Sequence, residues 1–93
     1  MIIGMAQKQP DEYLDYNVDF TDWMPDGDII TSAEVTVSPA GELTSNNIMI
    51  LNPIVKFWLA DGVNGSTYKL TVKITTDGGR IKEDELKIRV RDY

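Results

Sequence analysis

Cysteine and histidine are both absent from the 93 residues of this chain. Without cysteine the chain has no disulfides, no thiolate metal ligands and no thiol nucleophile. Without histidine it lacks the commonest general acid and base and the usual imidazole ligand of transition metals. The sequence therefore excludes most catalytic designs, and we expect no catalytic residue, no metal site and no cofactor.

Long apolar runs are also lacking. No stretch approaches the roughly 20 apolar residues of a membrane-spanning helix, so we expect no membrane partner. The opening "MIIGMAQKQ" has a short apolar run and no basic start, so we expect no signal peptide and assembly in the cytoplasm. Apolar residues make up 42% of the chain, which suits one domain with a single small core.

Positive charge is scarce in the first part of the chain. Residues 1–55 carry nine acids and one base, whereas residues 56–93 carry six acids and eight bases. Such asymmetry can steer subunits together, or the charges can pair within one domain. The near-equal number of acids around the last basic segment argues against nucleic-acid binding. The possible inter-subunit charges are Asp15, Asp19, Lys87, Arg89 and Arg91.

Apolar and polar residues alternate over most of the chain. This period of two predicts strands with one face toward a core. Turn residues separate the segments, and no long amphipathic helix is indicated. The predicted fold is all-β, an immunoglobulin-like β-sandwich of six or seven antiparallel strands. The alternating or apolar segments are residues 14–20, 29–37, 48–51, 55–60, 67–76 and 85–92.

Two turns carry more detailed expectations. The "DGGR" sequence at 77–80 predicts a tight hairpin between the last two strands. Ile81 stands at an odd-numbered position, whereas the apolar residues Leu86, Ile88 and Val90 stand at even-numbered positions. Because side chains alternate between the two faces of a strand, all four can face the core only if the strand has a bulge, which we expect within "IKEDEL". Tyr68 follows a loop and begins a strand, which is typical of a tyrosine corner whose hydroxyl bonds back to that loop.

An aspartate-rich stretch, "DFTDWMPDGDII" at 19–30, separates the first two predicted strands. The simplest interpretation is a turn, with Pro25 and Gly27 supplying its backbone angles. A calcium loop built on Asp22, Asp26 and Asp28 is a second, although the spacing does not match the EF-hand pattern. A carboxylate pair for glycoside hydrolysis is a third.

Both tryptophans are candidates for partner contact. Val55, Phe57 and Leu59 are expected on one face of a strand, and Trp58 falls on the other face. Its side chain therefore faces solvent, a partner or a covering loop. Trp23, near the aspartate turn, either seals one end of the sandwich or contacts a partner. The partner-binding residues proposed from the sequence are Trp58, Trp23, Met24, Ile2 and Ile3.

Taken together, these motifs resemble a known family. The run "VKFWLADGVNGSTYKLTVKITTDGGRIKEDELKIRV" at 55–90 is similar to the C-terminal half of small tailed-bacteriophage fiber-tail adaptor proteins. Those chains share a pattern like V-x-x-W-L-x-x-G-x-x-G-x-x-Y, then a T-T-x-x-G-R turn and a strand ending in I-R-V. The front half, "DEYLDYNVDFTDWMPDGDIITSAEVTV" at 11–37, is similar to the family's opening. The resemblance covers about residues 10–91.

The resemblance implies a non-enzymatic virion protein that joins the tail to fibres or to neighbouring ring proteins such as the portal or connector. It further implies several copies in a symmetric assembly. A head-to-tail connector or capsid decoration protein is the alternative within this class, and a carbohydrate-binding module is the alternative outside it. Residues 1–9 are expected to form a flexible or partner-binding arm, and residues 10–93 the sandwich.

Overall fold

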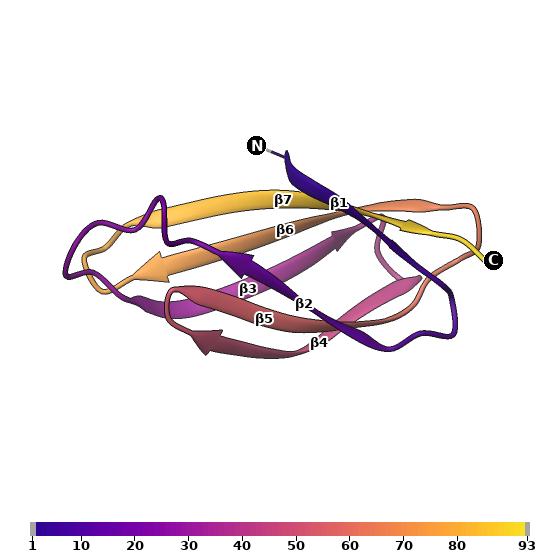
Figure 1. The fold of residues 1–93 in the computed structure, drawn as a ribbon, viewed down its shortest axis with the longest axis horizontal. Coiled ribbons are helices and arrows are strands. Elements are labelled where there is room, and N and C mark those ends of the chain that lie inside the picture. Colours follow the sequence, from indigo (N-terminus) through magenta and orange to yellow (C-terminus); the bar gives the residue numbers. More distant parts are fainter. Residues whose placement is uncertain (1, 93) are drawn as a thin grey trace.

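The computed structural model describes residues 2–92, with only the backbone described for Ile2 and Ile3. Within this range the chain forms seven strands and no helix, arranged as two packed sheets (Figure 1). The prediction of an all-β sandwich is confirmed. The strands are β1 (Ile2–Lys8), β2 (Leu14–Asp19), β3 (Ile30–Ser38), β4 (Leu43–Leu51), β5 (Ile54–Asp61), β6 (Thr67–Thr76) and β7 (Ile81–Val90).

The four-stranded sheet has the order β1-β7-β6-β3 and the three-stranded sheet the order β2-β5-β4. All neighbouring strands are antiparallel except β1, which runs parallel to β7. The expectation that every strand is antiparallel is therefore wrong for this pair. Some neighbouring strands are consecutive in the chain and others are joined by connections that cross between the sheets, as in a Greek-key sandwich. The immunoglobulin-like type itself stays a prediction.

The N-terminal segment differs most from expectation. We expected an arm over residues 1–9 and a sandwich over residues 10–93, but Ile2–Lys8 is a strand of the sandwich's own sheet. Backbone pairing with β7 holds this segment, so it needs no strong alternation of apolar side chains to form a strand. Contact between this segment and a partner stays a prediction.

The core follows from the alternation of the central strands. Along β5 and β6 every second residue is buried, and these residues face each other between the sheets. Val55, Phe57 and Leu59 are fully buried, so Trp58 points to the outer face of its sheet. The buried apolar residues are Val18, Phe20, Ile30, Leu43, Val55, Phe57, Leu59, Tyr68, Leu70, Val72, Ile74, Leu86, Ile88 and Val90.

The pairing of β6 with β7 is continuous from Thr75 opposite Ile81 to Thr67 opposite Arg89. The expected bulge is therefore wrong. The inward phase of β7 is continued by Asp84, which is buried, and by Lys82, while Ile81 is 62% exposed. The Lys82 ammonium lies 3.8 Å from the Asp84 carboxylate. This ion pair allows two charged residues to stand at inward-facing positions of β7, where the alternation predicts apolar residues.

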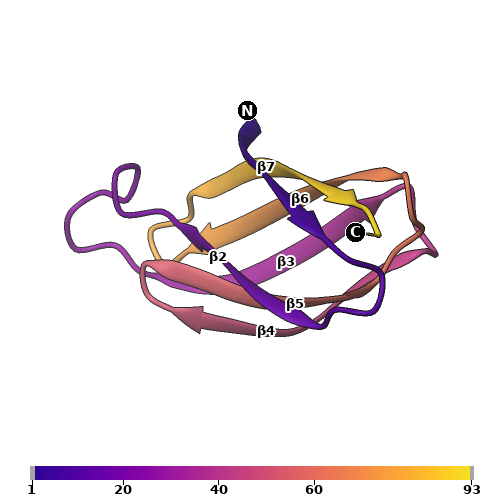
Figure 2. The ribbon, with the colours of Figure 1, turned by 45° about the vertical axis from the view of Figure 1, so that its right-hand side comes forward.

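The molecule is elongated, with extents of 44 × 23 × 20 Å. The loop at 20–29 and the turns at 52–53 and 77–80 lie at one end, and the turns at 39–42 and 61–66 lie at the other (Figures 1 and 2). The outer surfaces of the two sheets form opposite broad faces. No described helix is long and apolar enough to cross a membrane.

Two buried polar groups stabilise the end that holds the 61–66 turn. The hydroxyl of the fully buried Tyr68 accepts a hydrogen bond from the Val63 backbone at 2.9 Å and donates one to Glu42 at 2.8 Å, which confirms the expected tyrosine corner. Lys8 is only 1% exposed, and its ammonium donates to the carbonyls of Gln9, Pro10 and Asp61. Burial lowers the pKa of Lys8, although the negative charges of Asp61, Glu12 and Asp11 oppose this change.

Candidate interaction surfaces

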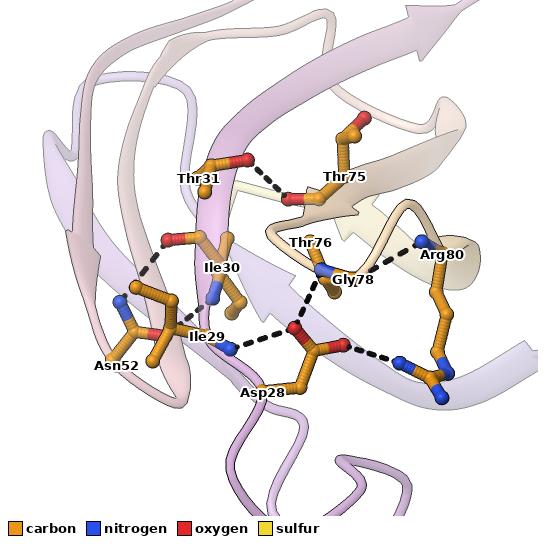
Figure 3. A network of polar contacts seen from close by, with 9 residues as sticks. All are labelled: Asp28, Ile29, Ile30, Thr31, Asn52, Thr75, Thr76, Gly78 and Arg80. Atoms are coloured by element: carbon orange, nitrogen blue, oxygen red, sulfur yellow. Dashed lines mark hydrogen bonds and ion pairs between the residues drawn. The ribbon is translucent and has the colours of Figure 1, made fainter.

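The aspartate loop is held by one buried carboxylate. The side chain of Asp28 is 5% exposed and accepts hydrogen bonds from the backbone of Gly78 at 2.9 Å and from its own neighbour Ile29 at 3.0 Å (Figure 3). Its second oxygen lies 3.0 Å from the Arg80 guanidinium. These bonds join the 20–29 loop to the 77–80 turn, so that Asp28 acts as a structural clamp.

The hydrogen bonds of the clamp also change the pKa of the Asp28 carboxyl group. A hydrogen bond from the Thr76 hydroxyl, followed by those from Gly78, Ile29 and Arg80, lowers the pKa of Asp28 against the opposing effect of desolvation. Thr76 in turn accepts a hydrogen bond from the Arg80 backbone (Figure 3). The carboxylate is therefore held in its ionised form by donors from the neighbouring hairpin.

The side chain of Asn52 ties the same end together from the other sheet. Its amide group donates to the Ile30 carbonyl and its oxygen accepts from the Ile30 backbone N–H at 2.7 Å (Figure 3). Because Asn52 lies between β4 and β5, this reciprocal pair links the two sheets where β3 begins. The 20–29 loop thus emerges from a fixed base.

The other aspartates of the loop do not converge. Asp19 accepts hydrogen bonds from the side chain and backbone of Thr21, and these lower its pKa. Asp22 and Asp26 are exposed. Among the described residues no group of three or more histidine, cysteine or acidic side chains is arranged to hold a metal ion. The geometry is that of a turn and gives no support to the calcium loop.

An open depression of about 380 Å³ lies beside this loop, lined by Thr21, the 24–29 segment, Asn52 and Pro53. Two carboxylates, Asp26 and Asp28, reach its lining. Asp28 is bonded to Gly78, Ile29 and Arg80, and these bonds favour its ionised form. A general acid must be protonated, so the geometry does not favour Asp28 as the acid of a glycoside-hydrolysing pair.

Trp58 forms half of a stacked aromatic pair on the outer face of the three-stranded sheet. The ring of Tyr13 lies 4.9 Å from that of Trp58, centroid to centroid, at an interplanar angle of 26°. The Tyr13 hydroxyl donates to Asn46 at 2.7 Å and accepts from Asn47 at 2.9 Å. Tyr13 thus covers one side of the Trp58 ring and is itself held in place. A carbohydrate-binding module would present an uncovered aromatic ring to the sugar, so this geometry does not support that alternative.

A bulge in β4 prepares this arrangement. The pairing of β4 with β5 shifts between Asn46 and Met49, and Asn47 adopts a left-handed φ of 51°. Asparagine tolerates this conformation better than most residues, and a bulge commonly redirects side chains at a sheet edge. Here it lets the Asn47 amide reach Tyr13 and leaves Ile48 and Met49 exposed.

Exposed apolar side chains continue from the aromatic pair along β4. Met49 and Leu51, each 49% exposed, lie opposite Lys56 and Ile54 in register and therefore share the outer face with Trp58. We call Tyr13, Met49, Leu51, Ile54 and Trp58 the outer-face patch. Met49 and Leu51 belong to "TSNNIMILNPI" at 44–54, which is more apolar than a simple loop and was a candidate for contact with neighbours. No feature of the sequence pointed to Tyr13.

The remaining sequence-based contact residues do not join this patch. Trp23 and Met24 are partly buried against the core, and the Lys82 ammonium lies 6.0 Å from the Trp23 ring centroid. This packing matches the alternative in which Trp23 seals an end of the sandwich. The side chains of Ile2 and Ile3 lie outside the described residues, and the backbone of this segment belongs to β1.

The sequence-predicted charges lie on opposite faces of the sandwich. Asp15 is 3.4 Å from the Lys56 ammonium on the outer face of the three-stranded sheet. Lys87 and Arg89 lie on the outer face of the four-stranded sheet, because Leu86, Ile88 and Val90 face the core. Asp15 and Asp19 therefore do not pair with β7 within one chain, and Arg91 follows the end of that strand.

Comparison with known proteins gives a family match over almost the whole fold. The family described as podophage GP4 fiber-tail adaptor protein gp77 matches residues 8–89, from the buried Lys8 to the exposed Arg89. No curated protein matches the chain. The match spans β2 to β7 almost entirely, together with the aspartate loop, the tyrosine corner and the outer-face patch. The chain therefore belongs to the podophage GP4 fiber-tail adaptor protein gp77 family.

Proposed function

We propose that this protein is a non-enzymatic adaptor of the phage tail and that the outer-face patch is its contact with another virion protein. The patch carries the proposal, because a rigid Tyr13–Trp58 pair beside exposed Met49 and Leu51 provides the aromatic and apolar anchor typical of interface centres. Family membership supports a structural role in the virion. The partner is a tail protein, a portal or connector ring protein, or a fibre.

The rigidity of the patch favours binding. Tyr13 is fixed by stacking and by two hydrogen bonds to Asn46 and Asn47, so little side-chain freedom remains to be lost on docking. Lys56 and Asp15 lie beside the aromatic pair and supply a polar rim. We expect multiple copies in a symmetric assembly that forms in the host cytoplasm, without nucleic acid or membrane contact.

The test is incorporation into phage particles. A phage lacking this gene is supplied with the wild-type chain, with Met49→Asp/Leu51→Asp, or with Thr36→Asp as a matched control on the opposite outer face. Quantitative mass spectrometry of purified particles measures each chain relative to portal and tail proteins. We expect the wild type and the control at a fixed copy number and the patch variant at about a tenth of that level or less.

Several results decide between this function and its alternatives. If the patch variant is incorporated as well as the wild type, the outer-face patch is not the contact with the virion protein. A copy number that follows the capsid would favour a decoration protein, and one that survives tail removal would favour a connector. Absence of the wild-type chain from particles, together with glycan binding that Trp58→Ala abolishes, would favour the carbohydrate-binding module.

A further inference from the structure

The outer face of the four-stranded sheet carries two lysines directly opposite each other. Lys69 of β6 pairs in register with Lys87 of β7, and Arg89 is the next outward residue along β7. Like charges at opposed positions of neighbouring strands destabilise a sheet. Glu85 lies 3.8 Å from Lys69 and offsets only part of this charge. We call Lys69, Lys87 and Arg89 the basic cluster.

Most other basic side chains have an internal role. Lys8 is bonded to carbonyls, and Lys56, Arg80 and Lys82 each lie within 4 Å of a carboxylate. In the part of the chain that the structure describes, Lys87 and Arg89 have no ion pair or hydrogen bond through their side chains. The basic cluster therefore has one partly neutralised charge, on Lys69, and two charges, on Lys87 and Arg89, that no described acid pairs with.

The opposite surplus lies at the end of the molecule that holds the 20–29 loop. Asp22, Asp26 and Asp77 are exposed there, and no described ion pair or side-chain hydrogen bond engages them. The nearby base Arg80 is already paired with Asp28 at 3.0 Å. The Asp28 clamp fixes the loop, and Asp77 donates its backbone N–H to Ile29, a residue that is 51% exposed. We call Asp22, Asp26 and Asp77 the acidic tip.

We propose that the basic cluster of one copy of this chain binds the acidic tip of a second copy. Charge complementarity identifies the occupant, since the chain itself presents a rigid acidic surface at a site remote from the cluster. The net charge of −6 and the acidic tip disfavour a polyphosphate occupant. The contact accounts for the opposed lysines, because the incoming carboxylates relieve their repulsion.

The two surfaces fix the kind of assembly. The acidic tip lies at one end of the long axis, whereas Arg89 lies near the far end of β7, next to the opposite end of the molecule (Figure 1). Because the two patches differ, the contact is heterologous, and repetition generates a ring or a filament. It involves neither Tyr13–Trp58 nor the rest of the outer-face patch, so it does not depend on the proposed tail contact.

Charge reversal in two variants tests the contact. Lys87→Glu/Arg89→Glu makes the cluster acidic, and Asp22→Lys/Asp26→Lys makes the tip basic. Sedimentation velocity of the purified full-length chain, at rising concentration and at low and high salt, measures association. We expect wild-type assemblies that weaken in high salt, and self-association about tenfold or more weaker in each variant alone. Lys73→Gln, on the same face, is the control: it removes a positive charge outside the basic cluster without setting an acid opposite Glu83 and Glu34, and it should associate as the wild type does.

Mixing the variants supplies the decisive result. Each reversed surface then meets a complementary one, so the equimolar mixture should regain assemblies in which the two variants alternate. Circular dichroism should show both variants folded, because the altered side chains lie on the surface and have no internal partner. The proposal is overturned if the wild type stays monomeric at every concentration, if the cluster variant associates normally, or if the mixture stays monomeric. A monomeric wild type that binds particles through Lys87 and Arg89 would assign the cluster to an acidic segment of another protein.

Discussion

The Lys8 ammonium donates a 2.7 Å hydrogen bond to the backbone carbonyl of Asp61, which joins the end of β1 to the end of β5 in the other sheet. The same ammonium bonds the carbonyls of Gln9 and Pro10. One side chain therefore fixes the turn between β1 and β2 and closes this end of the sandwich. The buried lysine stabilises the fold because all three of its donors find acceptors.

Replacing Lys8 should test this closure. Lys8→Met keeps the apolar stem but leaves the three carbonyls without their donor, and we expect a loss of about 2–3 kcal/mol in the free energy of unfolding. Urea denaturation followed by circular dichroism measures the change. Lys73→Met, an outward lysine without a described ion pair, is the control and should change stability little. Equal stability of Lys8→Met and the wild type would show that the lysine is not a structural closure.

The Asp28 clamp predicts a pH dependence. Its hydrogen bonds lower the pKa of the folded state below the ordinary value of 3.8, so the stability that the ionised carboxylate contributes is present above pH 3.8. That stability is lost as the pH falls through the folded pKa. Asp28→Asn should therefore melt at a lower temperature than the wild type at neutral pH, and the difference should shrink below pH 3.8.

Thermal melting from neutral to acidic pH measures this difference for both chains. Asp26→Asn changes an exposed carboxylate of the same loop that has no described bond, and it should melt as the wild type does. A constant gap between Asp28→Asn and the wild type at all pH values would contradict the role of ionisation. No gap at any pH would contradict the clamp itself.

Substituting two glycines at one end of the sandwich distinguishes the cost of backbone strain from the cost of steric crowding. Both have left-handed backbones, with φ of +101° at Gly62 and +90° at Gly65. A Cβ at Gly62 would lie 2.7 Å from Cγ2 of the buried Val90, whereas one at Gly65 would meet nothing within 4 Å. We expect Gly65→Ala to cost about 1 kcal/mol from strain alone and Gly62→Ala about 2–4 kcal/mol. Chemical denaturation of the two variants measures the difference, and equal costs would refute the close approach to Val90.

Fluorescence can report on the aromatic pair. In a Trp23→Phe background Trp58 is the sole tryptophan, and Tyr13→Ala uncovers one side of its ring. We expect its emission to shift to the red with a stability loss of about 0.5–1.5 kcal/mol. Ile81→Ala removes a side chain that is 62% exposed on the other sheet and serves as the control. Unchanged emission in Tyr13→Ala would mean that the stacking does not persist in solution.

Alternation was sufficient to predict β5 and β6, where every second residue is buried, and the phase of Trp58 on the outer face. It was not sufficient for β1, whose Gly4 and Ala6 give little apolar signal and whose pairing depends on the backbone of β7. It was also not sufficient for the early part of β4, where the bulge after Asn46 interrupts the period.

The candidate site was less predictable than the fold. Trp58 could be assigned to an exposed face from its neighbours, but its partner Tyr13 lies far away in the sequence, and only the folded chain brings the rings together. Trp23 looks equally exposed in sequence, yet it packs against the core because Phe20 and the turn after it direct it inward. Local pattern cannot distinguish these two tryptophans, since tertiary packing decides both.

The parallel pairing of β1 with β7 has a mechanical consequence. Both strands run in the same direction, so a load applied between the start of β1 and the end of β7 pulls them along each other in opposite senses. The backbone hydrogen bonds between them would then share the load in shear instead of opening one by one. An antiparallel terminal hairpin pulled from its ends would unzip. Under such a load the edge strand β1 would be harder to separate from the sheet than an edge strand that unzips.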